Sequence, residues 1–311
     1  MQLLKRNRGL INYLAKKITR RYLRNISKEY INTKDQLAMF SFDFISQMIS
    51  VDGRFEDSEL NLIKKLLKER LDKKVILDIG ANIGNHTLAF SKISKKVCAF
   101  EPNIFIFELL KINTNKLKNV EIFNFGASDR NQSILARVPK LNCGGGSLTL
   151  DEKNSQPNKF IEVLFKLKSL DKVKMFSKMN IGMVKIDVEG HELNAFKGMK
   201  ILLRKNKPII LFEQNRGIFN QTSDEIKFLK SVGYKYLYEF SKIDDWIMPS
   251  YLPTIFRSLF RFFEVLIFGE PISEFKLNLI THLEKKSYDI LIFSCEPLNG
   301  VVFLNKKLGL K

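Results

Sequence analysis

The chain has 311 residues, of which 45% are hydrophobic, so it can bury a large core, and a wholly polar, unfolded chain is excluded. It carries 52 Lys and Arg against 33 Asp and Glu, which gives a formal net charge of +19. This excess favours an anionic surface, a phosphorylated substrate or a nucleic acid as partner, although a composition generally rich in Lys accounts for it equally well.

Three cysteines, Cys98, Cys143 and Cys295, lie far apart in the sequence. Their spacing matches neither a zinc site nor a disulfide framework, so a reducing compartment is expected. The first 25 residues hold cations but no sustained apolar run. We therefore expect no signal peptide and a cytoplasmic protein, either free or peripheral at a membrane.

Residues 1–70 are predicted to form a basic helical extension. Leu10, Leu14 and Ile18 recur at helical spacing, while Lys and Arg fill the other face. Such a helix either lies on an anionic membrane, through residues 1–25, or packs on the protein's own core, and we prefer the second interpretation. A further amphipathic helix is predicted over about 57–71.

Strands and helices are predicted to alternate over 73–240. Helices are expected at about 85–94, 104–116, 191–204 and 224–232, and strands at about 74–80, 96–103, 120–129, 160–167, 182–190, 208–214 and 234–240. A last strand is expected in "YDILIFSCE", 288–296. This alternation predicts a parallel sheet that is covered by helices on both faces.

Residues 241–287 interrupt the alternation and are predicted to be a helical insertion before the last strand. They contain the Phe-rich sequence "TIFRSLFRFFEVLIFG", which separates charged from aromatic residues if it is helical. Its charges and short length make it a poor transmembrane span. A helix over 254–268 would lie on a membrane surface, cover the active site as a lid, or pack on the sheet as an ordinary helix.

The sequence "VILDIGANIGNHTLAF", 75–90, places an acid and two glycines where a strand passes into a helix. In open α/β sheets ligands bind at this end of the strands, and glycine lets the backbone come close to them. The spacing G-x-x-x-G differs from the dinucleotide and P-loop motifs. S-adenosylmethionine has cationic groups and no phosphate, and it fits a loop that comprises Asp78, Gly80, Ala81, Asn82 and Gly84.

Two further strand ends favour a bound nucleoside. Glu101, followed by Asn103, ends the next strand, where a carboxylate can accept from both hydroxyls of a ribose. In "FGASD", Ala127 and Ser128 can flank an adenine, and Asp129 can accept from its exocyclic amine. Three strand ends in this order make a stronger prediction than the glycine turn alone.

The motifs "DIGANIGNHTL", "FEPN", "GASD", "KIDVEGHE" and "PIILFE" resemble those of the FkbM-type methyltransferases over about residues 70–240. The resemblance implies a class I methyltransferase domain, here 71–311, with a Rossmann-like α/β fold of seven strands whose last strand is antiparallel. It also implies S-adenosylmethionine as methyl donor and usually O-methylation, often of sugars in glycans or glycolipids. The basic extension and the Phe-rich insertion lie outside the shared motifs.

Methyl transfer to a hydroxyl is helped by a base, because the attacking oxygen loses its proton. "KIDVEGHE" ends the fourth strand, and Asp187 is predicted to be the general base or a metal ligand, on the same side as Glu189 if the strand alternation continues. His191 is the alternative base, since imidazole titrates near neutral pH. Glu213 ends the fifth strand and could face the same cleft, so that Asp187, Glu189 and Glu213 would suit Mg²⁺.

Two other residues of this motif are expected to have structural roles. Lys185 is expected to be structural rather than catalytic, and Glu192 to interact with the positive end of the following helix.

The most specific expectation is thus an O-methyltransferase that acts on a sugar hydroxyl, on a lipid-linked glycan if the basic helix and 254–268 bind a membrane. Two other classes stay open. A nucleic-acid methyltransferase would explain the charge, but the chain lacks an aromatic-flanked loop for a flipped base, so no nucleic acid is expected as partner. The other class is a non-catalytic, membrane-associated adaptor that keeps the donor pocket.

Overall fold

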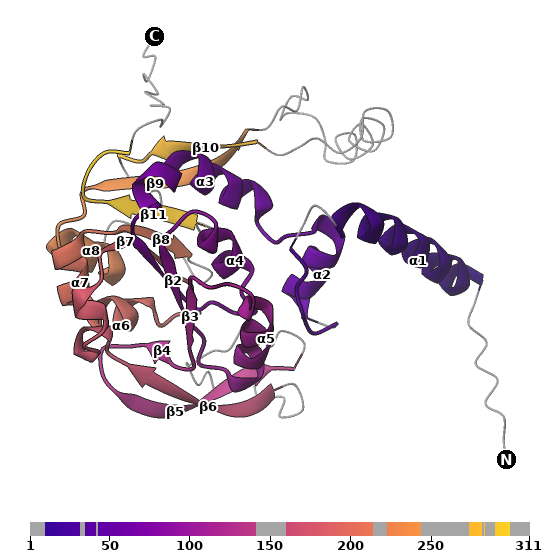
Figure 1. Ribbon diagram of the computed structural model, residues 1–311, viewed down its shortest axis with the longest axis horizontal. Helices are drawn as coiled ribbons and strands as arrows, with labels where there is room; N and C mark the ends of the chain where they lie inside the picture. The colour runs from indigo at the N-terminus through magenta and orange to yellow at the C-terminus, as the bar shows by residue number, and fades with distance from the viewer. Residues whose placement is uncertain are drawn as a thin grey trace, which may run out of the picture.

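An eight-stranded mixed sheet lies at the centre of the protein (Figure 1). The computed structural model describes residues 10–31, 35–41, 43–140, 160–213, 223–243, 274–281, 283 and 290–298. Across the sheet, the strands are β10 (Glu274–Leu279), β9 (Tyr236–Ile243), β11 (Ile290–Ser294), β8 (Ile209–Glu213), β7 (Ile181–Ile186), β1 (Val75–Ile79), β2 (Lys96–Phe100) and β3 (Val120–Phe123). The strands from β3 to β8 are parallel, whereas β11 runs antiparallel to both β8 and β9, as predicted for the last strand.

Helices cover both faces of this sheet, as predicted. One face carries α3 (Asp57–Leu71), α4 (Asn85–Ser91) and α5 (Ile104–Thr114), and the other carries α6 (Glu192–Lys197), α7 (Lys200–Asn206) and α8 (Asp224–Ser231). Alternation along β1 divides the core, because Leu77 packs on the α6–α8 side and Ile76 on the α3 side. Helix α3 thus contributes to the core of the sheet although it falls within the predicted extension 1–70, and the boundary at residue 70 stays a prediction.

The sheet has one strand more than the seven predicted. The additional strand β10 pairs antiparallel with β9, with Leu279 opposite Tyr238. It comes from the segment predicted to be a helical insertion, and its Leu277 is buried in the same cluster as the apolar side chains of α3. Its sequence EFKLNL alternates polar and apolar residues, a pattern typical of a strand, and the prediction of a helical insertion overlooked this signal. The Phe-rich part, 254–268, lies outside the described residues.

A second sheet of three strands stands beside the main one. β4 (Gly126–Ala127) and β5 (Gln132–Pro139) pair with opposite edges of β6 (Phe160–Lys168). The single strand predicted over 120–129 is wrong, because β3 ends at Phe123 and the chain then leaves the main sheet to form β4. The sequence predicts β6 but not β5. Two short turns of 3₁₀-helix, η3 (Leu170–Lys172) and η4 (Phe176–Lys178), lead from β6 to β7.

The single helix predicted over 191–204 is also wrong, since the chain forms α6 and α7 with a break at Gly198 and Met199. A Cβ atom at Gly198 would lie 1.8 Å from the carbonyl oxygen of Ser128. The break therefore occurs where the helical segment passes directly against the backbone that follows β4, an approach that only glycine permits.

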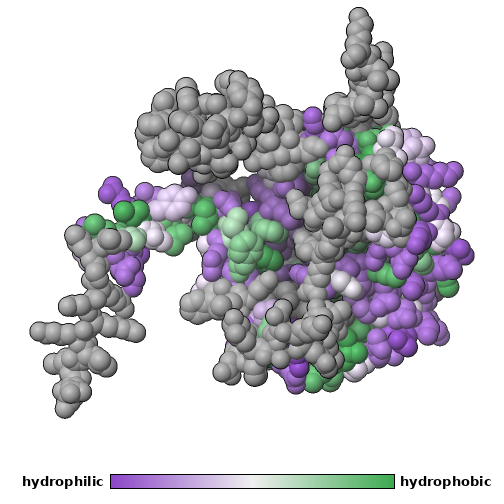
Figure 2. Space-filling view, turned by 180° about the vertical axis from the view of Figure 1, so that it is seen from behind, coloured by the Kyte–Doolittle hydropathy of each residue, from purple (hydrophilic) through white to green (hydrophobic). Residues whose placement is uncertain are grey.

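Helix α1 (Leu10–Tyr30) projects from the body of the protein, and α2 (Phe44–Asp52) follows it (Figure 1). On α1, the side chains of Leu14, Ile18 and Tyr22 are 45%, 67% and 53% exposed. The preferred interpretation that this helix packs on the protein's own core is therefore wrong. Figure 2 shows hydrophobic and hydrophilic residues side by side along the projecting helix. No helix in the described part of the chain is both long and apolar enough to cross a membrane.

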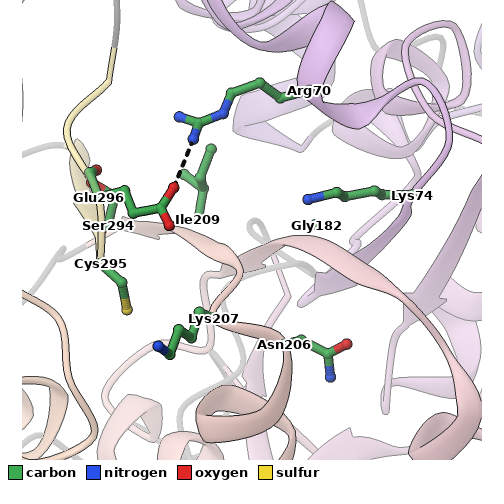
Figure 3. Close-up of a pocket in the computed structure, with 9 residues that line it drawn as sticks. All are labelled: Arg70, Lys74, Gly182, Asn206, Lys207, Ile209, Ser294, Cys295 and Glu296. Atoms are coloured by element: carbon green, nitrogen blue, oxygen red, sulfur yellow. Dashed lines mark hydrogen bonds and ion pairs between the residues drawn. The ribbon is translucent and has the colours of Figure 1, made fainter.

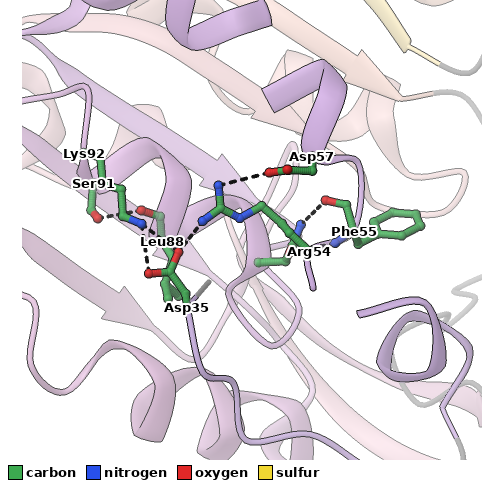
Figure 4. A network of polar contacts seen from close by, with 8 residues as sticks. Asp35, Arg54, Phe55, Asp57, Leu88, Ser91 and Lys92 are labelled. Atoms are coloured by element: carbon green, nitrogen blue, oxygen red, sulfur yellow. Dashed lines mark hydrogen bonds and ion pairs between the residues drawn. The ribbon is translucent and has the colours of Figure 1, made fainter. Parts of the chain in front are cut away.

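The chain between α1 and α3 is held to the body by ion pairs (Figure 4). Asp35 accepts hydrogen bonds from Arg54 and from Lys92, the latter 2.7 and 2.9 Å from its two oxygens. Burial acts to raise the pKa of Asp35, but the two cations outweigh it and hold the pKa below its ordinary value. Because Lys92 ends α4, these contacts fix the segment against the helix that follows the glycine turn.

Candidate active site

The glycine turn forms a loop between β1 and α4, at the carboxyl ends of the parallel strands. Gly80 has φ +78°, and a Cβ atom there would lie 1.8 Å from the carbonyl oxygen of Asp187. The backbone amides of Gly80 and Ala81 both donate to the carbonyl of Phe100, at 3.0 Å each. The loop is thus pressed between the ends of β2 and β7, and Gly80 is required there because any side chain would clash.

The second half of this loop also depends on left-handed backbone. Asn82 has φ +50°, and its side-chain oxygen accepts from the amide of Ile83 at 2.7 Å. Gly84 has φ +97° and precedes α4, and a Cβ atom there would lie 2.9 Å from Leu110 of α5. Local backbone demands therefore explain why these residue types stand at these positions, independently of any ligand.

Asp78 lies behind the loop and is fully buried. Its Oδ2 accepts from the hydroxyl of Thr87 at 2.5 Å. Its Oδ1 is buried without a hydrogen-bond partner among the described residues, and it lies 3.7 Å from the ammonium of Lys185. Such an orphaned carboxylate oxygen is costly unless another group satisfies it, so it is a candidate contact for a ligand in the loop.

Lys185 is the residue whose importance the sequence analysis underestimates. Only 3% of it is exposed, and its Nζ donates to the carbonyl of Gly80 at 2.7 Å and to Asp187 Oδ2 at 3.3 Å. One ammonium thus links Asp78, the glycine loop and Asp187. A lysine inside the otherwise apolar strand "IGMVKI" is the signal for this role, since a buried lysine requires paired charges.

Glu101 follows β2 and is 7% exposed. Its Oε1 accepts from the amide of Asn103 at 2.8 Å, and its Oε2 accepts from the amide of Asn82 at 3.1 Å. Burial raises the pKa of Glu101 to about 7, although these two hydrogen bonds act in the opposite direction. A carboxylate has about four acceptor positions, so each oxygen keeps one for a ligand hydroxyl. Asn103 itself caps α5 by accepting from the amide of Phe105.

Ser128 connects the third predicted strand end to the "KIDVEGHE" motif. Its hydroxyl donates to Asp129 Oδ1 at 3.1 Å and lies 2.9 Å from His191 Nε2. The amide of Asn194 lies 3.3 Å from His191 Nδ1 and acts there as a donor, so Nε2 carries the proton that Ser128 accepts. Burial lowers the pKa of His191, while Asp129 acts to raise it. Ala127 is buried within β4, whereas Asp129 is exposed.

Asp187 is the first residue after β7, and its side chain is 27% exposed. Its amide donates to the carbonyl of Ile79, which fixes it beside the glycine loop. While Oδ2 accepts from Lys185, Oδ1 has no hydrogen-bond partner in the part of the chain that the structure describes. The carboxylate can therefore accept a proton from a molecule that enters beside the loop.

The prediction that strand alternation places Asp187 and Glu189 on one side is wrong. β7 ends at Ile186, and Glu189 and Gly190 then adopt left-handed backbone, with φ of +51° and +95°. The side chain of Glu192 turns back to accept from the amide of Gly190 at 2.8 Å. Burial raises the pKa of Glu192, and its contact supports the turn at the start of α6, the structural role expected for it.

Glu213 is the last residue of β8, with its backbone opposite Ile290 of β11, and its side chain lies outside what the structure describes. Across the residues that are described, no three His, Cys, Asp or Glu side chains are grouped so as to hold a metal ion. The Mg²⁺ site predicted from Asp187, Glu189 and Glu213 therefore gains no support, and the ammonium cation of Lys185 lies 3.3 Å from Asp187 Oδ2.

A contact between the N-terminal segment and the glycine loop is not predicted from the sequence. Asn113 on α5 donates to the carbonyl of Ile83 at 2.7 Å and to that of Ala38 at 2.9 Å. One side chain thus joins the loop to a segment more than forty residues upstream. No local pattern marks an asparagine for such a role.

The fold and this site define an α/β methyltransferase: a parallel sheet with an antiparallel strand beside β8, a glycine loop after β1 and an acidic residue after β2. Residues 78–236, about half of the chain, match the family described as the methyltransferase FkbM domain. The chain belongs to the FkbM methyltransferase family, which confirms the resemblance carried by "KIDVEGHE" and the other motifs.

Three individual proteins are similar to this chain over part of its length. The hexuronic acid methyltransferase AglP of Haloferax volcanii is 29% identical over 179 residues, which cover 57% of this chain and 72% of that protein. The "Probable ribosomal RNA small subunit methyltransferase A" of Methanosphaera stadtmanae is 37% identical over 93 residues, which cover 29% of this chain and 34% of that protein. The crystal structure of an FkbM methyltransferase from Methylobacillus flagellatus KT has a TM-score of 0.39 at 12% identity, over 86% of this chain and 59% of that one.

Membership of this family implies S-adenosylmethionine as the methyl donor. The residues present fit such a ligand. The buried Asp78 Oδ1 lacks a hydrogen-bond partner among the described residues. Glu101 keeps acceptor positions for a ribose.

Proposed function

We propose that this methyltransferase methylates a hydroxyl group of a sugar, with Asp187 as the general base. The observation that carries the proposal is the position of Asp187. Its backbone carbonyl lies against Gly80, and its partially exposed carboxylate bonds Lys185 through one oxygen and has no partner among the described residues for the other. A sugar as acceptor is supported by the similarity to a hexuronic acid methyltransferase.

When bound, S-adenosylmethionine supplies an electrophilic methyl group. Asp78, the loop from Gly80 to Gly84 and Glu101 are proposed to hold it, with Asn103 ordering Glu101. Ala127, Ser128 and Asp129 would border the adenine. Asp187 accepts the proton that the sugar hydroxyl loses, and Lys185 keeps the carboxylate oriented by bonding its other oxygen.

His191 is proposed to position Ser128 rather than to act as a base. Burial keeps its imidazole neutral near pH 7, and both ring nitrogens have partners, Ser128 and Asn194. It would have to break a hydrogen bond before it could accept a proton. Glu213 stays a predicted catalytic residue on its place at the end of β8 alone.

Replacement of Asp187 with Asn tests the proposal. Turnover with radiolabelled S-adenosylmethionine and glucuronic acid should fall by about 10²- to 10⁴-fold, because the amide cannot accept the proton. Donor affinity, measured by calorimetry, should stay unchanged. Asp224→Asn, in an exposed side chain on α8, is the matched control and should retain full activity. Unchanged turnover in Asp187→Asn would show that the base is elsewhere.

A nucleic-acid acceptor is the second candidate, which the net charge of +19 and the partial similarity to a ribosomal RNA methyltransferase favour. The two candidates differ in salt dependence, because binding to several phosphates releases several counterions, whereas glucuronic acid carries a single negative charge. Methyl transfer to RNA that falls steeply with salt, with no transfer to glucuronic acid, would establish this alternative.

The proposal includes a peripheral membrane location and a lipid-linked glycan as acceptor. On α1 the exposed apolar side chains of Leu14, Ile18 and Tyr22 share one face, and the sequence "KKITRRYLR" places cations on the other. Such a helix suits the surface of an anionic bilayer. The Phe-rich part over 254–268 is a further candidate by sequence.

Liposome flotation tests this location. The wild type should float with anionic vesicles and not with neutral ones, and a Lys16, Arg20 and Arg24→Gln triple variant should lose this binding. Lys64, Lys65 and Lys68→Gln on α3 removes the same charge from exposed positions and is the control. If the wild type does not float, the membrane part of the proposal is wrong, and the sugar part is unaffected.

A further inference from the structure

A polar pocket of about 190 Å³ lies at the edge of the sheet opposite the glycine loop (Figure 3). It is lined where β7 and β8 begin and where antiparallel β11 ends, by residues that include Gly182, Ile209 and Ser294. The glycine loop follows the other end of β1, which is five residues long. The pocket and the donor site are therefore separated by roughly 16 Å of strand.

The pocket has an excess of positive charge. Arg70, Lys74 and Lys207 line it, against the single carboxylate of Glu296. Arg70 pairs with Glu296 at 3.3 Å, whereas neither Lys74 nor Lys207 forms an ion pair with any described residue. Figure 3 shows the ammonium of Lys74 reaching in from one side and Arg70 from another. The remaining polar lining groups are neutral, since burial raises the pKa of the Cys295 thiol.

Gly182 shows that the position of Lys74 is built into the fold. A Cβ atom at Gly182 would lie 2.7 Å from Cδ and 2.8 Å from Cβ of Lys74. Glycine inside a central strand weakens the strand and commonly marks a close approach by another part of the chain. Here it leaves space for the aliphatic stem of Lys74 to lie across β7, so the half-buried lysine presents its ammonium to the pocket.

Lys207 reaches the pocket from a strained position. It ends α7 in the left-handed conformation, with φ +47°, where glycine or asparagine is usual. Lysine there costs about 1 kcal/mol relative to glycine. Both lysines of the pocket are thus placed at a cost in backbone stability: Lys74 requires glycine at position 182, and Lys207 itself has left-handed backbone.

We propose that this pocket binds a phosphate group, either as inorganic phosphate or as part of a small phosphomonoester. A doubly charged oxyanion matches the excess of two positive charges that Arg70, Lys74, Lys207 and Glu296 leave. The volume is below that of pockets for drug-sized ligands, roughly 300 Å³ and more, so it suits one phosphate group rather than a nucleotide.

Glu296 does not prevent such binding. The side chains of Arg70 and Glu296 are 42% and 76% exposed, and exposed pairs of this kind contribute little. A phosphate can replace Glu296 as the partner of Arg70, because a guanidinium bonds two phosphate oxygens at once.

Calorimetric titration with inorganic phosphate, and separately with glycerol phosphate, tests the proposal in the full chain at low salt. The wild type should bind one equivalent. Lys74→Met with Lys207→Met keeps both aliphatic stems but removes the charges, and it should weaken binding by more than about tenfold. Lys64→Met with Lys166→Met, both exposed and outside the pocket, is the matched control and should bind as the wild type does.

Titration of each variant with S-adenosylmethionine shows whether it is folded, because the donor site lies at the other edge of the sheet. Tighter binding of glycerol phosphate than of phosphate would identify a phosphomonoester as ligand, and the reverse would identify the free ion. Absence of saturable binding to folded wild type, or equal weakening in both double variants, would overturn the proposal. Neither result bears on the acceptor of the methyl group.

Discussion

Glu101→Gln is expected to remove the pH dependence of donor binding. Glu101 is 7% exposed, and burial raises its pKa to about 7. Each of its oxygens already accepts one backbone hydrogen bond, from Asn82 or Asn103. Only the carboxylate form offers a further acceptor position on both oxygens, so only this form can bind both ribose hydroxyls. The affinity of the wild type for S-adenosylmethionine should therefore rise with pH until Glu101 is ionised.

The size of this effect follows from the raised pKa. With a pKa of about 7, roughly a tenth of the Glu101 side chains are ionised at pH 6 and roughly nine tenths at pH 8. If the ionised form alone binds the donor, the association constant increases about tenfold over this range, which corresponds to about 1.4 kcal/mol.

The raised pKa of Glu101 also makes the free energy of unfolding depend on pH, in the direction opposite to donor affinity. Between the ordinary pKa of 4.5 and the folded value of about 7, the folded protein keeps a proton that the unfolded chain has lost. The free energy of unfolding without ligand should thus fall as pH rises through this window. Denaturant titration at pH 5 and pH 7 measures this decrease, which should be smaller in Glu101→Gln.

Calorimetry with S-adenosylmethionine at pH 6, 7 and 8 is the assay for donor binding. Glu101→Gln should bind more weakly than the wild type at pH 8, and its affinity should be the same at all three pH values. Glu121→Gln on the neighbouring strand β3 is the matched control, because its partly exposed carboxylate pairs with Lys96 away from the loop. A wild-type affinity that is constant from pH 6 to pH 8, or an equal slope in Glu101→Gln, would refute the reasoning.

Three further substitutions test the geometry around the loop. Gly80→Ala should abolish donor binding and destabilise the fold by more than the roughly 1–2 kcal/mol of left-handed strain, because its Cβ would lie 1.8 Å from the Asp187 carbonyl. Gly233→Ala is the control, because Gly233 has φ +108° and a Cβ there would have no atom within 4 Å, so it introduces the backbone strain alone. An equal loss of unfolding free energy in the two variants, measured by denaturant titration, would contradict the close approach. Lys185→Met should lower the free energy of unfolding by about 3–5 kcal/mol, since it leaves Asp78 and Asp187 without their shared cation; a loss below about 1 kcal/mol would show that the pair is not needed. His191→Gln should keep turnover within about tenfold and leave the pH–rate profile unchanged, whereas loss of a pH limb with a fall of about 10²-fold or more would make His191 the base.

The sequence reveals the glycine loop because its left-handed backbone calls for particular residue types. Gly80 and Gly84 stand at positive φ, and Asn82, a residue type that tolerates this region, stands between them. The strands β1, β2, β7 and β8 are mainly apolar, which is what a sheet buried on both faces requires, although Asp78 and Lys185 interrupt β1 and β7. Alternation of such runs with helices was sufficient to predict the doubly covered sheet. The antiparallel last strand was implied only by the family resemblance.

Tertiary structure decided which side chains meet. Asp78 faces Lys185 because the two are register partners in the pairing of β1 with β7, more than a hundred residues apart. His191 meets Ser128 across 63 residues, a contact that the sequence does not predict. Register and long-range packing depend on the whole core and not on local pattern, so they could not be predicted.

Long-range packing also explains why the sequence analysis misplaced some elements. Strand β10 exists because β9 offers it an edge and α3 covers Leu277, and neither condition is visible in six residues of sequence. The break between α6 and α7 reflects the approach of Gly198 to Ser128. The apolar stripe of α1 predicts an amphipathic helix, but the arrangement of the whole chain decides that Leu14 and Ile18 are exposed. A sequence pattern specifies that a face is apolar, whereas the tertiary structure decides what, if anything, covers it.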